Sequence, residues 1–126
     1  MTRARIAVAT SVVAAVSLAL AVAGYGRTNS VPTLTGTVGP GFTISLKSKG
    51  KAVKSLKAGT YKFVVSDKSS IHGFTIEQEK GGTFEKALTS VPSTGTKTTT
   101  VKLKAGKWKF YCPSHESSMF GFFTVK

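Results

Sequence analysis

Short runs of alternating apolar and polar residues constrain the fold of this chain more than any other feature. In residues 107–112, KWKFYC, Trp108 and Phe110 lie on one side of an extended backbone and both lysines lie on the other. Comparable runs occur at 42–46, 61–65 and 97–104. This period of two, with many β-branched and aromatic residues, is typical of half-buried strands. No segment after residue 24 has a convincing helical pattern, so we predict an all-β domain.

Turn sequences that contain glycine separate these runs. They occur at 38–41, 47–51, 57–60, 80–82, 93–95 and 104–107. Their spacing is typical of a β-sandwich or a β-barrel. Residues 79–96 have a weaker pattern, and we expect a long loop there with one short strand or helical turn.

The N-terminal segment, residues 1–23, predicts export. Arg3 and Arg5 precede an almost wholly apolar run at 6–20, and Ala21–Ala23 matches the small-x-small pattern of a signal-peptidase site. We therefore expect a cleaved signal peptide and a protein located in the periplasm, at the cell surface or outside the cell. The alternative is an uncleaved anchor, because the run is nearly long enough to span a bilayer. Only in that case would the protein contact a membrane.

The remaining residues, 24–126, suit one small domain with a strong positive charge. Arg27 and fifteen lysines face five acidic residues, a formal net charge of +11. The lysines are spread along the chain, arginine is nearly absent and no nucleic-acid motif occurs, so we predict no nucleic-acid partner. We favour a solvated lysine coat that keeps the domain soluble, and an acidic protein partner remains the alternative.

Residues that bind metals are concentrated near the C-terminus. Cys112 is the only cysteine of the chain, and His115 and Met119 follow it within eight residues. Exported proteins normally pair their cysteines, so a single thiol indicates a dimer disulfide, a reactive nucleophile or a metal thiolate. A Cys–His hydrolase would need a third, orienting group, and a structural zinc site would more often use several cysteines.

Strand parity connects Cys112 to a second histidine far away in the sequence. Cys112 shares its parity with Trp108 and Phe110, and His72 shares its parity with Phe74 in the run SIHGFTIE. Both side chains should therefore point into the domain. A single inward histidine usually belongs to the core. Two imidazoles, a thiolate and a weak thioether are, however, the ligand set of an electron-transferring copper site.

The segments HGF (72–74) and YCPSHESSMFGFFTV (111–125) resemble the blue copper proteins, or cupredoxins, of the plastocyanin and amicyanin type. The resemblance covers essentially all of residues 24–126. The Cys-x2-His spacing is that of both proteins, whereas His-x3-Met is one residue shorter than in plastocyanin and one longer than in amicyanin.

The resemblance implies a Greek-key β-sandwich of about seven to eight strands. It also implies one copper ion, with His72, Cys112 and His115 as equatorial ligands and Met119 as the axial ligand. The expected function is single-electron shuttling between redox partner proteins by a monomer that is not an enzyme. Copper storage or delivery is the alternative function.

Two residues depart from the family pattern. Gly73 stands where the family commonly has an asparagine that braces the ligands, and Pro113 stands where it often has a hydroxyl residue. We expect the amide of Ser114 to donate a hydrogen bond to the Cys112 sulfur. The family also implies a hydrophobic surface around His115, with Pro113 and Phe120 at its rim. We expect Glu116 to be solvated.

Overall fold

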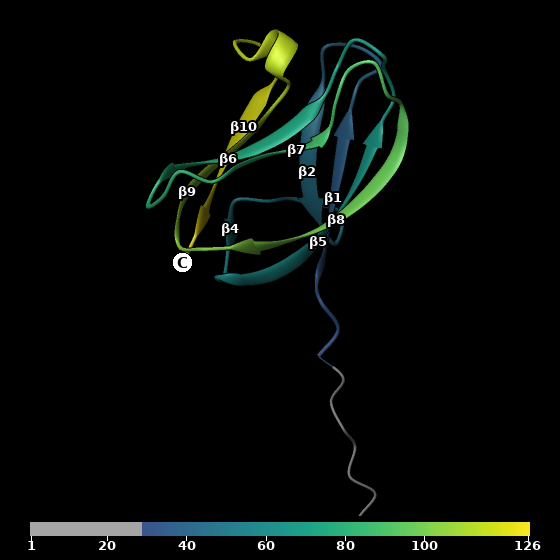
Figure 1. Ribbon diagram of the computed structural model, residues 1–126. Coiled ribbons are helices and arrows are strands. Elements are labelled where there is room, and N and C mark those ends of the chain that lie inside the picture. Colours follow the sequence, from purple (N-terminus) through teal and green to yellow (C-terminus); the bar gives the residue numbers. More distant parts are fainter. Residues whose placement is uncertain (1–28) are drawn as a thin grey trace, which may run out of the picture.

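Two five-stranded β-sheets, packed face to face, make up the part of the chain that the computed structural model describes, residues 29–126 (Figure 1). The expected signal peptide, residues 1–23, lies outside the described residues. The first sheet has the order β3-β2-β1-β5-β8 and the second has the order β4-β10-β9-β6-β7. The strands are β1 (Thr33–Val38), β2 (Ile44–Ser48), β3 (Lys51–Ala52), β4 (Ser55–Leu56), β5 (Gly59–Asp67), β6 (Phe74–Lys80), β7 (Glu85–Thr89), β8 (Gly95–Leu103), β9 (Gly106–Tyr111) and β10 (Phe120–Val125).

The structure confirms the all-β sandwich and excludes the barrel for the described residues. It has ten strands where about seven to eight were expected. Two of the additional strands, β3 and β4, are two residues long, too short to show a period of two. The uncertain stretch 79–96 contains the five-residue strand β7. Within residues 29–126 the one helical element is a 3-10 turn, η1 (Pro113–His115).

Strand β9 carries the residues that precede the cysteine, and it lies between β10 and β6 in the second sheet. Trp108 and Phe110 are buried on its inner side, as the alternation predicted. Tyr111 has the opposite parity and is nevertheless buried. Antiparallel pairing on both sides holds β9 firmly, so the backbone at the start of the ligand segment has little freedom.

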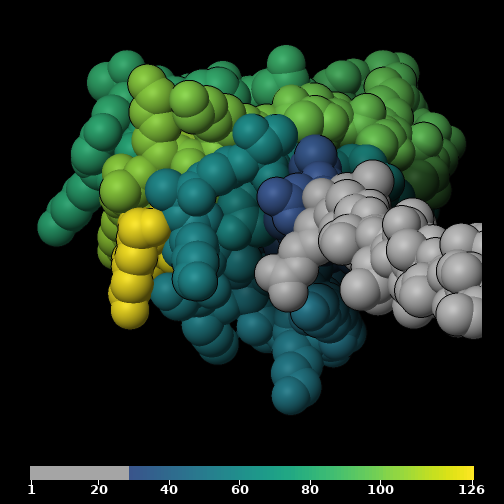
Figure 2. Space-filling view, turned by 90° about the horizontal axis from the view of Figure 1, so that it is seen from below, coloured from purple at the N-terminus to yellow at the C-terminus, as the bar shows by residue number. Residues whose placement is uncertain are grey.

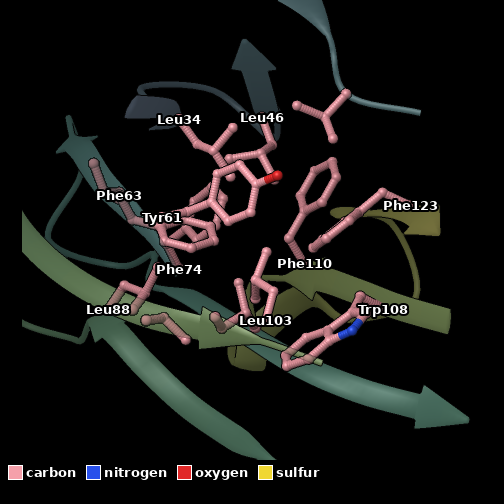
Figure 3. Packing of buried hydrophobic residues seen from close by; sticks show 14 of the residues in the cluster. Leu34, Leu46, Tyr61, Phe63, Phe74, Leu88, Leu103, Trp108, Phe110 and Phe123 are labelled. Carbon is pink, nitrogen blue, oxygen red and sulfur yellow. The ribbon is translucent and has the colours of Figure 1, made fainter. Parts of the chain in front are cut away.

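Aromatic and aliphatic side chains fill the space between the two sheets (Figure 3). Phe110 stacks on Phe74 of the neighbouring strand with 5.8 Å between ring centroids, and Trp108 stacks on Phe123 at 6.2 Å. The Phe110 ring also covers Gly121 of β10, where an added Cβ would overlap the ring atoms. Close packing of this kind fixes β6, β9 and β10 relative to one another.

Three connections meet at one end of the sandwich. They are the β1–β2 loop, the β5–β6 loop and the segment with η1 between β9 and β10 (Figure 1). The opposite end, seen from below in Figure 2, carries the C-terminus at its surface. Among the described residues, no helix has the length and hydropathy needed to cross a membrane.

Candidate metal centre

His72, Cys112 and His115 come together at the end of the sandwich where the three connections meet. Their potential ligand atoms all lie within 4.8 Å of one another. The two Nδ1 atoms are 3.1 Å apart, and the Cys112 Sγ lies 3.8 Å from Nδ1 of His72 and 3.7 Å from Nδ1 of His115. His72 thus forms one cluster of nitrogen and sulfur donors with Cys112 and His115, which follow it in the chain by 40 and 43 positions.

The size of this cluster fits a single metal ion. The three distances define a triangle whose centre lies about 2.1 Å from each donor atom, inside the range of about 2.0–2.3 Å for metal–nitrogen and metal–sulfur bonds in proteins. Two imidazoles and one thiol suit copper or zinc, whereas magnesium and calcium take oxygen ligands. The arrangement can therefore hold one such ion without a large movement of any ligand.

The position of each donor follows from the strand that it adjoins. Cys112 comes directly after β9 and keeps the inward parity of Trp108 and Phe110, so its side chain is fully buried. His72 is also fully buried, two residues before β6, and its amide donates to the Ser69 carbonyl at 3.3 Å. The burial of the thiol argues against the dimer disulfide that a lone cysteine could otherwise indicate.

Met119 is buried directly before β10, in the connection that also carries Cys112 and His115. Its amide donates to the His115 carbonyl at 2.8 Å, and its carbonyl accepts the amide of Cys112 at 3.0 Å. These two hydrogen bonds close the connection from Cys112 to Met119 into a compact turn. Its side chain belongs to the hydrophobic core cluster, so the thioether lies in apolar surroundings at this end of the core.

The hydrogen bond to the cysteine sulfur comes from a different residue than the sequence indicated. The amide of Gly73 donates to the Cys112 Sγ at 3.5 Å, whereas Ser114 was the expected donor. Ser114 lies in the exposed turn η1, in which the His115 amide donates to the Cys112 carbonyl at 3.0 Å. The prediction was wrong because it considered only residues that neighbour Cys112 in the sequence. The actual donor, Gly73, lies in the β5–β6 loop, 39 residues away in the sequence.

The same geometry accounts for glycine at position 73. A Cβ on Gly73 would lie 3.0 Å from the Thr89 carbonyl oxygen and 3.4 Å from the Ser90 Cα. The nearest atom on the other side is Cδ of Pro113, at 3.7 Å. A side chain at position 73 would therefore be tight against the Thr89 carbonyl, which glycine avoids.

Phe42 contributes a feature that the sequence analysis missed. Its ring lies edge-on to both imidazoles, with centroid distances of 5.5 Å to His72 and 4.9 Å to His115, although 63% of the residue is exposed. The alternation at 42–46 had placed Phe42 in a strand, but β2 begins at Ile44 and Phe42 belongs to the loop. An aromatic residue directly after the Gly-Pro-Gly turn was the signal that could have indicated a loop position.

The surface around the half-buried His115 is partly as expected. Pro113 is exposed and Phe120 is 45% exposed, so both are accessible on this side of the domain. Glu116 is exposed, as expected, and its carboxylate also accepts a hydrogen bond from the Lys109 Nζ at 2.7 Å. It is not one of the three clustered donors.

Tyr111, the residue before the cysteine, is held in its protonated form. Its hydroxyl donates to the Glu85 carboxylate at 2.6 Å. Burial, followed by this hydrogen bond, raises the pKa of Tyr111 well above that of a free tyrosine. The contact also explains why a residue of outward parity is buried, because Glu85 of β7 lies over it.

Comparison with solved structures shows which proteins share this fold. Reduced rusticyanin matches with a TM-score of 0.53 and 21% identity over 75% of this chain and 78% of that chain. Rusticyanin from Thiobacillus ferrooxidans matches with a TM-score of 0.51 and 22% identity over 75% and 76% of the two chains. Auracyanin A, a "blue" copper protein from Chloroflexus aurantiacus, matches with a TM-score of 0.52 and 16% identity over 75% of this chain and 98% of that chain. No protein-family model and no curated protein matches the sequence.

These matches to a copper protein, rusticyanin, and to a "blue" copper protein, auracyanin A, confirm the expected cupredoxin-like fold. At identities of 16–22% the likeness concerns the arrangement of the strands.

Proposed function

We propose that this protein is a small exported blue copper protein that shuttles single electrons between redox partners and is not an enzyme. The observation that carries the proposal is the cluster of His72, Cys112 and His115 around a point about 2.1 Å from each donor atom. The ligand set of two imidazoles and one cysteine sulfur is that of blue copper sites, which add a weak axial ligand such as methionine. Met119 is the proposed axial ligand.

A copper ion bound here would supply a one-electron Cu(I)/Cu(II) couple. The chain supplies a rigid environment, since His72 and Cys112 are fully buried and the backbone at the cysteine is hydrogen-bonded to the backbone at Met119. A site that barely rearranges when the charge changes favours fast electron transfer. The Gly73 amide withdraws charge from the sulfur and so favours the reduced form.

Electrons would enter and leave through the exposed side of His115. Its ring is half-buried and lies against Phe42, with Pro113 and Phe120 exposed near it. An apolar surface of this kind suits brief contacts with a partner protein. Storage or delivery of copper is less well supported, because buried donors and a single methionine in residues 29–126 do not favour release.

Copper binding can be tested on the protein from residue 24 onward. We expect one Cu(II) ion per chain and an intense visible absorption from the copper–thiolate bond, measured by titration with Cu(II) in an absorption spectrometer. Binding of Cu(II) with only the weak absorption of nitrogen and oxygen ligands would contradict the proposed site. Zn(II) is the matched control, because it can occupy the same donors without producing colour.

The positive charge should affect reactions with anionic redox partners. Oxidation of the protein in its reduced, Cu(I)-loaded form by hexacyanoferrate(III) should slow as salt is raised, because the Debye length falls from about 10 Å at 0.1 M to about 3 Å at 1 M. Stopped-flow absorption measures this rate directly. A rate that stays constant over this range would assign the lysines to solubility alone, and a cationic oxidant provides the control with the opposite salt dependence.

A further inference from the structure

We propose that the ion pair between Lys109 and Glu116 clamps the metal-binding loop, residues 113–118, onto the second sheet and thereby slows the loss of copper. The two residues would act as positioning residues, since neither is one of the clustered donors. This inference rests on the proposed copper site, but its structural part can be tested without metal.

The ion pair connects the loop with β9, the central strand of the second sheet. Lys109 lies on the outer side of β9, opposite Phe122 of β10 on one side and Glu77 of β6 on the other. Its Nζ is 2.7 Å from Oε1 of Glu116, the residue directly after His115. The lysine side chain is only 13% exposed, whereas that of Glu116 is 52% exposed.

Aromatic rings hold the lysine in place. The Lys109 Nζ lies 5.1 Å from the ring centroid of Tyr111, 5.5 Å from that of Phe120 and 6.0 Å from that of Phe122. Cation–π attraction from several rings restricts a side chain that would otherwise be flexible. Because the ammonium group is already positioned, Lys109 loses less entropy on pairing with Glu116 than a free surface lysine would.

The loop has few other side-chain attachments to the sheets. No residue of η1 is buried, and η1 has no side-chain cap. Most of its hydrogen bonds are internal, such as those from the Ser118 and Met119 amides to the His115 carbonyl. Within residues 29–126, the hydrogen bond of Glu116 is the one through which a side chain of this loop reaches a strand. The asparagine brace of the family is absent as well, since position 73 is glycine.

Loss of copper requires that His115 moves away from the other two donors. Since Glu116 is the next residue, this movement also separates Glu116 from Lys109. The ion pair therefore adds to the free energy of local opening without affecting the closed geometry of the donors. An effect of about fivefold on the opening equilibrium corresponds to the upper end measured for partly exposed pairs.

The test compares copper loss from four variants of the ion pair into an excess of a strong chelator. Glu116→Gln and Lys109→Gln should each lose copper about fivefold faster than the unmodified protein, while the visible spectrum before chelation stays the same. The double variant should be no faster than either single one, because both remove the same interaction. The exchanged pair Lys109→Glu with Glu116→Lys should recover part of the retention.

Lys107→Gln is the matched control. The Lys107 Nζ also lies over the Phe122 ring, at 4.3 Å, but it has no carboxylate partner among the described residues, 29–126. This variant should lose copper at the unmodified rate. Faster copper loss from Lys107→Gln, equal to that from the other two variants, would show that the effect is not specific to this ion pair and would overturn the clamp. An unchanged rate in Glu116→Gln would overturn it as well.

Hydrogen exchange of the metal-free protein separates this inference from the proposed function. In Glu116→Gln the amides of Cys112 and Met119, which close the loop, should exchange about fivefold faster, whereas amides in the middle of β9 should not change. Faster exchange in a protein that never binds copper would sustain the clamp and reject the copper site. Unchanged exchange at both amides would reject the clamp whatever metal is bound.

Discussion

The Cys112→Ser variant should keep the fold of the domain and lose the intense visible absorption with Cu(II) entirely. The absorption requires a copper–thiolate bond, and a serine hydroxyl neither ionises at neutral pH nor offers sulfur orbitals. The structure places the sulfur 3.8 Å and 3.7 Å from the two imidazole nitrogens, so its removal takes away one of three converging donors.

The fold should survive this change because serine and cysteine differ little in volume. The buried hydroxyl costs about 1–3 kcal/mol in the free energy of unfolding where its hydrogen bonds are imperfect. Circular dichroism and urea unfolding of the metal-free variant provide the control. A Cys112→Ser protein with an unchanged visible spectrum would disprove the copper–thiolate assignment.

The Met119→Leu variant should retain its colour and have a higher reduction potential. A thioether donates weakly along the axis and stabilises Cu(II) more than the soft, three-coordinate Cu(I). Its loss therefore favours reduction, with about 59 mV for each tenfold change in the one-electron equilibrium. Cys112 and both histidines remain, so the absorption should persist.

The change in core packing should have little effect on the free energy of unfolding of this variant. Leucine nearly conserves the volume of methionine, and such exchanges in a core usually cost less than about 1.5 kcal/mol. Voltammetry measures the reduction potential, and urea unfolding of the metal-free protein measures the change in the free energy of unfolding. An unchanged potential would make Met119 a core residue. The axial position would then be empty or filled by the Ile71 carbonyl, since the Glu116 carboxylate is held by Lys109.

Much of the candidate site could be predicted because strand parity is a local property. The inward direction of Cys112 depends only on its place after Trp108 and Phe110, and the structure has all three side chains buried. His72, assigned by parity with Phe74, is buried too, although it lies in a loop two residues before β6 begins. The all-β class follows from the same alternation.

Other features depend on loops that come together from distant parts of the chain. Phe42 contacts the imidazoles only because the β1–β2 loop lies beside the two connections that carry His72 and His115. The Gly73 amide reaches the Cys112 sulfur across 39 residues of sequence. No spacing or periodicity within one segment carries this information.

The sequence by itself determined which residues can bind a metal and which way the strand residues among them point, since residue type and parity are properties of a single segment. The tertiary structure decided how the site is held together. Strand β1 pairs in parallel with β5, a contact between non-consecutive strands, and Lys109 meets Glu116 because β9 turns back into β10 beside it. These interactions arise from packing and charge between segments, and the pattern within a single strand does not contain them.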